Sequence, residues 1–364
     1  MKVRLGDYVS IKTGRLDANA ASENGKFPFF TCSVEPLKID KYSYDCECVL
    51  VAGNGDLNVK YYYGKFDAYQ RTYIIESRNK NILSVKYLYF LLDNYLDTLR
   101  KEAIGGVIKY IKLSNLSEAK IKLLDLEKQL EIVNILEKIN LLISLRKNQL
   151  KKLDELVKCR FIEMFGTFPE NSKNWTICTI KEIVSDVRYG TSRASVDGGK
   201  YPYLRMNNIT YDGELDLTDL KYIDIPDKEL EKCTVKCGDV LFNRTNSKEL
   251  VGKTCVYNRN DTMVLAGFII RIRVNENILP VFLAMFLNMD FSKTMLKEMC
   301  KSAIGQANIN ATELQKIRII LPPIELQEEF VEFKNQTDKS KLEIEKSLDK
   351  LEILKKSLIQ KYFG

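Results

Sequence analysis

The chain lacks the side chains with which most enzymes do acid–base or nucleophilic chemistry. Its 364 residues include no histidine, which excludes Ser-His-Asp and Cys-His catalysis. Gly252-Lys253-Thr254 resembles the end of a phosphate-binding loop, but Ser247 stands where that loop needs an earlier glycine. Asp219-Leu220-Lys221 could belong to a nuclease, yet such triplets arise often by chance when 29% of the residues are charged. We therefore expect no catalytic residues.

The motifs that would bind a metal or a cofactor are also missing from the sequence. Nine cysteines are scattered along the chain, and the close pairs Cys46-Glu47-Cys48 and Cys233-x-x-x-Cys237 lack the repeated spacing of a zinc site. Pro322-Pro323 lacks the flanking residues of a methyltransferase's catalytic tetrapeptide, and Gly53-Asn54-Gly55 is too short for a cofactor loop. We expect free thiols, no metal and no cofactor.

Two long amphipathic helices are expected to position whatever the chain binds. Between Leu126 and Phe165, apolar residues recur at steps of three and four without a proline or glycine. This pattern predicts one helix about 60 Å long, at roughly 1.5 Å per residue. The stripe consists of Leu126, Leu130, Val133, Leu136, Ile139, Ile143, Leu150, Leu153, Val157, Phe161 and Met164. A second stripe runs from Ile324 to Phe363. A long helix with a single stripe needs a partner, so we predict that the two pair as an antiparallel coiled coil.

The chain contains an internal repeat. Gln129 recurs 198 residues later as Gln327, and Phe165-Gly166 recurs as Phe363-Gly364. Further pairs at this separation are Glu131 and Glu329, Val133 and Val331, Leu150 and Leu348, Leu153 and Leu351, and Leu156 and Leu354. Ala103-Ile104-Gly105 recurs as Ala303-Ile304-Gly305 after 200 residues. The repeat predicts a tandem duplication of a globular domain followed by a long helix.

The repeat divides the chain into four parts. They are a first globular domain over residues 1–124, a central helix over 125–166, a second globular domain over 167–322 and a C-terminal helix over 323–364. Each globular part combines β-like runs with a helix, predicted over Lys86 to Arg100 and over Ile278 to Met295. The fold class is α+β, with two related mixed α/β domains joined by the helix pair in pseudo-two-fold symmetry. The offset between the copies grows along the chain, which predicts an insertion in the second copy, with Arg205 to Glu231 as the candidate region.

The net charge of +7 is confined to the globular parts. The two helical stretches carry sixteen acidic and sixteen basic residues, which leaves 40 bases against 33 acids in the rest of the chain. Balanced charge is typical of the solvated faces of a coiled coil, whereas a basic excess in globular domains favours a polyanion as the partner. No apolar run approaches about 18 residues, and the N-terminus lacks a signal peptide's apolar core. We therefore expect a cytoplasmic protein that binds no membrane.

The junctions between domain and helix resemble those of the specificity subunit of type I restriction–modification systems. Residues 319–327 are very close to the family's apolar-Leu-Pro-Pro-apolar-Glu-x-Gln junction. Residues 121–129 depart from it, with Leu124-Asp125 in place of the prolines, so we expect that helix to be less sharply capped. The Gly-rich step at 303–310 and the Gly-Asp-apolar-Leu strand at 238–244 also resemble the family. The resemblance covers the full length in the right order.

This resemblance implies a protein that reads DNA and has no catalysis of its own. Each globular part would be a target recognition domain for one half of a split double-stranded DNA sequence. The helix pair would act as a ruler that fixes the gap between the halves. The implied partners are two methyltransferase subunits and, in the full complex, two restriction subunits. Half-sites about one DNA turn apart, roughly 10 base pairs, suit a reader of this kind.

Direct readout of base edges needs polar side chains in loops, and both globular parts supply them. In the first part the candidate DNA-binding residues are Lys12, Arg15, Asn19, Thr31, Ser33, Asn54, Lys60, Tyr62, Gln70, Arg71 and Lys109. In the second they are Arg188, Thr191, Ser192, Arg193, Arg205, Asn207, Asn208, Arg244, Thr245, Asn246, Lys248 and Gln306. We expect about a third of them to touch DNA, mostly at phosphates, because backbone contacts outnumber base contacts.

Two other functions fit parts of the same pattern. A coiled-coil scaffold whose two domains bind protein or carbohydrate would have the same helices, and a non-specific DNA binder would have the same basic excess. The position of the charge, the polar loops and the junctions favour the DNA-reading interpretation over the scaffold. A non-specific binder would need neither two diverged domains nor a fixed ruler.

Overall fold

The computed structural model of the chain describes residues 2–303 and 306–364, and within residues 301–306 it describes the backbone strands alone. The predicted repeat at Ile304-Gly305 lies outside the described residues. The chain divides into two compact units, which are residues 1–148 with 345–364 (unit 1) and residues 149–344 (unit 2). No helix among the described residues is long and apolar enough to cross a membrane.

Unit 1 is built on a six-stranded sheet with the strand order β2-β7-β5-β6-β3-β4. Neighbouring strands are antiparallel except β3 and β6. Helix α1 (Val85–Glu102) confirms the predicted helix, and its apolar face joins the core that the sheet forms. The other elements are β1 (Lys2–Arg4), η1 (Leu5–Asp7), β2 (Val9–Thr13), η2 (Ala18–Ala20), β3 (Phe27–Phe30), β4 (Leu37–Ile39), β5 (Tyr44–Ala52), β6 (Val59–Ala68), β7 (Thr72–Ser77), α2 (Leu113–Ser117) and β8 (Lys120–Lys122), which pairs with β1.

Unit 2 repeats this plan with its strands divided among four sheets, β10-β17-β13-β15, β12-β11-β16, β14-β19-β18 and β20-β9. Its elements are β9 (Thr176–Thr179), η3 (Ile180–Ile183), β10 (Val184–Tyr189), β11 (Tyr201–Leu204), η4 (Met206–Asn208), β12 (Lys221–Ile223), α4 (Asp227–Cys233), β13 (Val240–Asn243), β14 (Thr245–Asn246), β15 (Thr254–Val256), β16 (Val264–Leu265), β17 (Ile269–Val274), α5 (Pro280–Asn288), α6 (Asp290–Met299), β18 (Lys301–Ala303), β19 (Gln306–Asn308), α7 (Ala311–Gln315) and β20 (Arg318–Leu321). Elements η4 and α4 fall in the predicted insertion and have no counterpart between β3 and β5 of unit 1.

The prediction of one helix over Ile278 to Met295 is wrong, because the structure has the two helices α5 and α6 there. Met289 between them adopts an extended backbone with ψ 151°. The break follows Asn288, whose side-chain amide binds the N–H and the C=O of Thr254 at 3.2 and 2.6 Å. The end of α5 is thus tied to strand β15, and the chain turns before α6 begins.

The predicted repeat is confirmed by two glycines that occupy the same place in the two units. The Gly14 N–H donates to Thr72 O at 3.1 Å, and the Gly190 N–H donates to Ile269 O at 3.2 Å. A Cβ on Gly14 would lie 2.1 Å from Ala68 O at the end of β6, and one on Gly190 would lie 2.2 Å from Leu265 O at the end of β16. Only glycine leaves room for this approach of two backbones, so the turn after the first long strand is the same in both copies.

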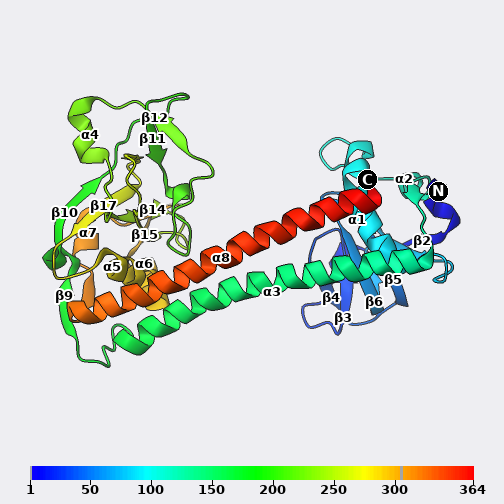
Figure 1. Cartoon of the computed structure of the whole chain (residues 1–364), viewed down its shortest axis with the longest axis horizontal. Helices are drawn as coiled ribbons and strands as arrows, with labels where there is room; N and C mark the ends of the chain where they lie inside the picture. The colour runs from blue at the N-terminus through cyan, green and yellow to red at the C-terminus, as the bar shows by residue number, and fades with distance from the viewer. Residues whose placement is uncertain (1, 304–305) are drawn as a thin grey trace. The chain divides into compact units, whose positions relative to one another are not determined.

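Helices α3 (Leu126–Phe165) and α8 (Ile324–Phe363) are each continuous over 40 residues, which confirms the predicted long helices (Figure 1). Unit 1 contains the first half of α3 and the second half of α8. In unit 1 Lys147 Nζ of α3 lies 3.4 Å from Glu352 Oε1 of α8. Unit 2 contains the other two halves.

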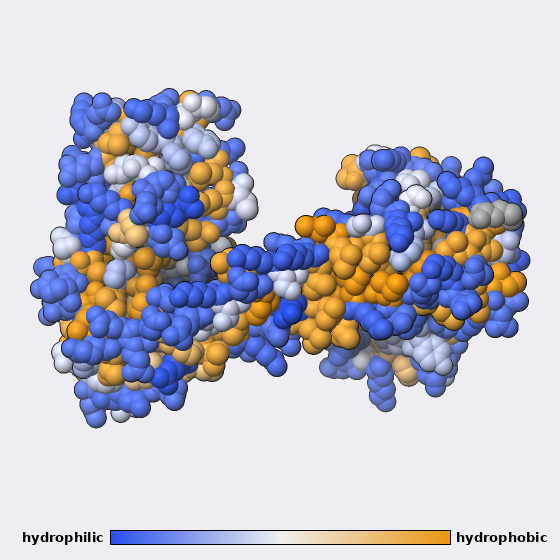
Figure 2. Space-filling view, in the orientation of Figure 1, coloured by the Kyte–Doolittle hydropathy of each residue, from blue (hydrophilic) through white to orange (hydrophobic). Residues whose placement is uncertain are grey.

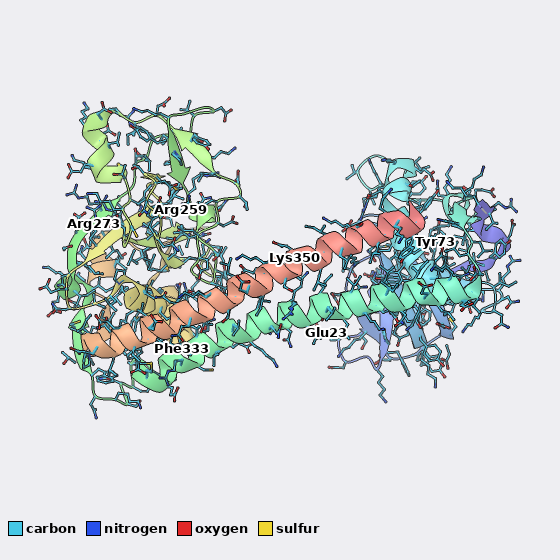
Figure 3. The ribbon with its side chains drawn as sticks, in the orientation of Figure 1. Glu23, Tyr73, Arg259, Arg273, Phe333 and Lys350 are labelled. Atoms are coloured by element: carbon cyan, nitrogen blue, oxygen red, sulfur yellow. The ribbon has the colours of Figure 1, made fainter. Side chains whose placement is uncertain are left out.

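Within unit 2 the two helices run antiparallel. Asp154 and Lys341 form an ion pair at 2.6 Å, and Arg160 and Glu329 form another at 2.9 Å. The Arg160 guanidinium also lies 5.8 Å from the ring of Phe333, which Figure 3 labels on α8. Residue numbers rise along α3 as they fall along α8, so the predicted antiparallel pairing is confirmed in this unit.

The buried face of α3 departs from the predicted stripe at one position. Leu130 is 51% exposed, whereas Ile132 is buried beside Val133 and Leu136. The reason is Gln129, which points into unit 1 and is fully buried. Successive helical residues are about 100° apart around the axis, so an inward Gln129 turns Leu130 outward.

Asp125 caps the start of α3. Its Oδ1 accepts a hydrogen bond from the Lys128 N–H at 2.9 Å. An aspartate side chain is one of the favoured caps for the unpaired N–H groups of a first helical turn. The expectation that this junction is less sharply capped than the proline junction is therefore wrong.

A buried glutamine fastens each long helix to its globular part. Gln129 Nε2 donates to Ile82 O and to Leu124 O, both at 2.8 Å. Its Oε1 accepts from the Ser84 N–H at 2.9 Å. One side chain thereby binds the loop before α1 and the end of the segment that leads into α3.

Gln327 makes the same three bonds in unit 2. Its Nε2 donates to Asn277 O at 3.2 Å and to Pro322 O at 2.9 Å. Its Oε1 accepts from the Leu279 N–H at 2.9 Å. The recurrence of glutamine at a separation of 198 residues therefore has a structural cause.

Replacing Gln327 with alanine is expected to lower the free energy of unfolding of unit 2 by about 2–4 kcal/mol, because three buried backbone groups lose their partner. Urea unfolding of the full chain, followed by the fluorescence of the single tryptophan Trp175 in unit 2, measures this loss. Gln336→Ala is the matched control, since Gln336 is exposed on the same helix. Equal losses in the two variants would contradict the fastening role.

Two buried lysines lie beneath the insertion of unit 2. Lys293 is 5% exposed, and its Nζ donates to Gly252 O at 2.7 Å. Lys253 is also buried, and its Nζ donates to Met206 O at 3.0 Å and to Ile209 O. Burial, and next the charge of Lys253, lower the pKa of Lys293 to about 7.

Lys293→Met is expected to raise the free energy of unfolding at pH 7 and to flatten its pH dependence. Between pH 7 and about 10.4 the unfolded chain holds a proton that folded Lys293 lacks, so the stability of the native chain rises with pH in that window. Trp175 fluorescence in urea at several pH values measures the slope, and Lys316→Met, at an exposed position, is the control. An unchanged slope in Lys293→Met would contradict the prediction.

Candidate nucleic-acid interface

Six of the predicted DNA-binding residues come together in unit 2. They line a cleft of about 480 Å³ at the ends of strands β10, β11 and β13. The six residues are Thr191, Ser192, Arg193, Arg205, Asn207 and Arg244. The cleft is therefore built from segments that are far apart in the sequence, and its polar groups face a common space.

Backbone hydrogen bonds fix the walls of this cleft. The Thr191 N–H donates to Leu265 O, and the Gly267 N–H donates to Thr191 O, both at 2.7 Å. The Arg244 N–H donates to Phe268 O at 3.0 Å. The loop after β10, the end of β13 and the turn between β16 and β17 are thus held to one another by the main chain, so the side chains start from fixed positions.

Arg244 presents its charge to the cleft. Its guanidinium lies 4.9 Å from the centre of the Tyr189 ring. Its Nε is buried and makes no hydrogen bond within the described part of the chain, and its Nη1 makes a long contact of 3.5 Å with Gly267 O. Among the described residues, no carboxylate lies within ion-pair distance of Arg244. Its remaining donors can therefore bind an anion or a base edge.

Arg205 and Arg193 are each held by a carboxylate. Arg205 Nη2 lies 2.8 Å from Asp219 Oδ2, and Arg193 Nη2 lies 2.8 Å from Glu229 Oε1. The hydrogen bond from Arg205 lowers the pKa of Asp219, and the one from Arg193 lowers the pKa of Glu229. Both acids are therefore ionised at neutral pH and orient the two guanidinium groups at the rim of the cleft.

The other candidates of unit 2 lie elsewhere or are engaged in the fold. Arg188 pairs with Asp186 at 2.8 Å. Asn208 is buried, and its amide binds the Arg205 N–H and Asp216 O at 2.9 and 2.8 Å, so we do not carry it into the interface. Thr245 Oγ1 bonds to Asn308, Asn246 accepts from the Ser247 N–H, and Lys248 is exposed. The side chain of Gln306 lies outside the described part of the structure.

In unit 1 most candidates gather in loops at the ends of strands β2, β3, β5 and β6. The Gln70 N–H donates to Leu16 O at 2.9 Å, and the Gly53 N–H donates to Arg71 O at 2.8 Å. The Gly55 N–H donates to Lys109 O at 2.9 Å. The Tyr69 N–H donates to Phe30 O at 2.9 Å. Together these bonds bring into proximity the segments that carry Arg15, Thr31, Ser33, Asn54, Gln70, Arg71 and Lys109. Arg15 and Arg71 are exposed and have no carboxylate within ion-pair distance among the described residues.

The remaining candidates of unit 1 have other neighbours. Lys12 pairs with Glu76 at 3.0 Å. Asn19 lies in η2, where its N–H donates to Asp17 Oδ1 at 3.2 Å, and Tyr62 packs its ring against Phe30 and Phe66. Lys60 donates to Asn58, and burial lowers its pKa. Asn58 Nδ2 donates to Cys32 O at 2.8 Å, so Lys60 lies beside the segment that carries Thr31 and Ser33, whereas Lys12 and Tyr62 are engaged elsewhere in the fold.

Reasoning from polar loops missed the aromatic residues of the cleft. Phe268 is 49% exposed and lines the cleft beside Arg244. Tyr203 is buried, and its hydroxyl donates to Arg193 O at 2.9 Å. In an alignment of the two copies, Phe268 occupies the position of the candidate Arg71. This equivalence could have predicted Phe268 as a binding residue.

The family model of the type I restriction modification DNA specificity domain matches residues 1–155 and 172–355. The chain belongs to this family. It is 34% identical over 176 residues to the EcoDI type I restriction enzyme specificity subunit of Escherichia coli, a match that covers 48% of this chain and 39% of that protein. It is 32% identical over 202 residues to the putative MjaX specificity subunit of Methanocaldococcus jannaschii, covering 54% of this chain and 47% of that protein. The chain thus matches less than half the length of either relative.

Two solved structures share the fold over the whole chain. One is the S subunit of a type I restriction–modification system from M. genitalium, with a TM-score of 0.62, 17% identity, and coverage of 100% of this chain and 96% of that one. The other comes from work on complex assembly and conformational transition of the type I R-M system, with a TM-score of 0.60, 17% identity, and coverage of 100% and 97%. The predicted α+β fold with two repeats and two long helices is confirmed.

Proposed function

We propose that the chain is the DNA-recognition subunit of a type I restriction–modification complex and has no catalytic activity of its own. The observation that carries this proposal is the cleft of unit 2, where Arg244 is oriented by Tyr189 and has no carboxylate partner among the described residues. Arginine binds the O6 and N7 of guanine through two donors and also binds phosphate strongly. Membership of the specificity-domain family supports the same function.

Each globular part is proposed as one target recognition domain, with residues 1–124 and 167–322 as the two domains. In unit 1 the loops that carry Arg15 and Arg71 support this assignment. In unit 2 the polar cleft supports it. Because the two sets of side chains differ, the two units are expected to bind different half-sites of one split sequence in double-stranded DNA. We propose that the complex acts in the cytoplasm.

We propose two methyltransferase subunits as partners, and two restriction subunits in the full complex. The long helices offer a surface for the methyltransferase in unit 1, where Leu141, Leu145, Ile353 and Leu354 are exposed. Figure 2 shows hydrophobic residues along this stretch. Exposed apolar patches of this kind commonly mark a protein interface.

Ile353→Asp is expected to weaken co-purification of the methyltransferase by at least tenfold, because a charge would be buried in an apolar contact. Ile353 is 67% exposed in the chain itself, so its own fold tolerates the change. Lys350→Asp is the control on the same helix, at an exposed position that Figure 3 labels. Equal recovery of the methyltransferase with both variants would contradict this surface.

The proposed function is tested by sequencing the methylated bases of cells that express the chain with its neighbouring methyltransferase subunit. The expected result is one split motif, with two short specific halves around a fixed gap, that disappears when the chain is omitted. A folded complex with an active methyltransferase and no motif would overturn the proposal and favour the scaffold function.

A further inference from the structure

We propose that four backbone positions, common to both units, determine which bases each unit reads. The inference rests on the proposed function and adds the residues that set its specificity. The positions are occupied in unit 1 and unit 2, respectively, by Arg15 and Thr191, by Thr31 and Arg205, by Gly53 and Arg244, and by Arg71 and Phe268. Seven of these eight residues are polar or glycine. Phe268 is included because it occupies the position equivalent to Arg71.

Matching hydrogen bonds establish two of the four equivalences. The Gly53 N–H donates to Arg71 O at 2.8 Å, and the Arg244 N–H donates to Phe268 O at 3.0 Å. The carbonyl of the same residue also has a matching partner: Gly53 O accepts from the Ile111 N–H and Arg244 O accepts from the Ile309 N–H, both at 2.9 Å, and these isoleucines are 198 residues apart. Gly53 therefore corresponds to Arg244, and Arg71 to Phe268.

The other two equivalences follow from the neighbouring strands. The Tyr69 N–H donates to Phe30 O, and the Ala266 N–H donates to Leu204 O, both at 2.9 Å. The residues that follow Phe30 and Leu204 are Thr31 and Arg205. Arg15 and Thr191 follow Gly14 and Gly190, which approach the ends of β6 and β16 in the same way in the two units.

The arginines of the two units occupy different members of this set. Unit 1 places them at the first and fourth positions, as Arg15 and Arg71, and unit 2 places them at the second and third, as Arg205 and Arg244. At the fourth position unit 2 has Phe268, which is 49% exposed and offers an apolar surface such as a thymine methyl contacts. One scaffold thus presents two different patterns of donors at the same places.

Arg205 and Arg244 each have an incompletely bonded guanidinium group in the same cleft. The Nε atoms of Arg205 and Arg244 are both buried and make no hydrogen bond within the described part of the chain. Buried polar groups are nearly always paired in native proteins. Both arginines line the same cleft, so DNA bound in the cleft would meet the exposed nitrogens of their guanidinium groups.

The test gives unit 2 the residues of unit 1 at two adjacent positions, in the double variant Arg244→Gly with Phe268→Arg. The variant is expressed with the methyltransferase subunit, and the methylated motif is sequenced. The half read by unit 2 is expected to change or relax at one or more bases, with discrimination at a base altered on the order of tenfold or more. The other half and the gap should be unchanged.

Two further variants make the outcome decisive. Arg259→Gly is the control, because Arg259 (Figure 3) pairs with Asp261 at 2.7 Å and does not line the cleft, and it should leave the motif intact. Arg71→Phe changes an exposed residue of unit 1 and should relax the opposite half. An unchanged motif that is methylated uniformly less in the double variant and in Arg71→Phe would overturn the inference. A parent chain without any split motif would overturn the proposed function instead.

Discussion

Replacing Asp186 with serine is expected to lower the free energy of unfolding of unit 2 by about 3 kcal/mol, because it removes the carboxylate that neutralises a buried arginine. Arg271 is 1% exposed, and its Nη2 lies 2.7 Å from Asp186 Oδ2. The next carboxylate, Asp239, is 3.9 Å from Arg271 Nε and is already bound by Arg273 (Figure 3) at 2.8 Å. Loss of Asp186 leaves a buried charge without a close partner.

The equivalent positions in unit 1 indicate which second substitution should restore the stability that Asp186→Ser removes. Ile74 and Ser10 of unit 1 stand where unit 2 has Arg271 and Asp186, because their strands pair in the same register around Gly14 and Gly190. Ile74 is fully buried, so this site accepts an aliphatic side chain. The double variant Asp186→Ser with Arg271→Ile is therefore expected to recover most of the lost stability. Trp175 fluorescence in urea measures both variants, and additive losses would contradict the account.

The same pair should make unit 2 sensitive to acid. Burial raises the pKa of Asp186, but hydrogen bonds from Arg271 and Arg188 outweigh it, so the pKa lies below its usual value. A carboxyl group with a depressed folded-state pKa stabilises the fold fully above the unfolded value, near pH 4, and loses that contribution as the pH falls through the folded value. The difference in the free energy of unfolding between the native chain and the single variant Asp186→Ser should therefore shrink in acid.

Four extra residues in each long helix are expected to lengthen the gap between the two half-sites without changing either half. We would insert them after Asn148 in α3 and after Ile344 in α8, where each helix passes from one unit to the other. Contacts inside the units would then be kept. Four residues add about 6 Å of helix, which is close to two steps of the DNA helix at about 3.4 Å each.

Sequencing of the methylated motif measures this effect on the gap. The control is Lys151→Ala with Glu155→Ala, which changes an exposed pair on α3 at 3.9 Å without changing the helix length. The gap should stay constant in the control and grow by one or two base pairs in the insertion variant. An altered half-site with an unchanged gap would refute the idea that the helices act as a ruler.

The long helices and the repeat could be predicted from the sequence because their signals are local. An apolar stripe without proline or glycine indicates a helix whatever surrounds it. Gln129 and Gln327 were visible as a repeated pair, but their burial was not, and so Leu130 was assigned to the wrong face. The side chain that faces inward depends on which partner the folded chain offers, here three backbone groups of the globular part.

The cleft could be predicted only in part, because it depends on contacts between distant segments. Arg205 and Arg244 were found from their residue type and their places after strands. That Asp219 holds Arg205 follows from a contact between residues 14 positions apart, and that Asn208 is buried follows from the insertion folding back on it. Phe268 is apolar, so a search for polar loop residues does not find it. Only its equivalence to Arg71 in the other copy indicates a role in binding.

The central claim is that each globular part reads its own half of the DNA target. We would replace residues 167–322 with the matching segment of another family member of known motif and sequence the methylated bases in cells that also express the methyltransferase subunit. We predict that one half of the motif changes to that of the donor, while the other half and the gap stay the same. A motif in which both halves change, or in which neither does, would contradict the claim.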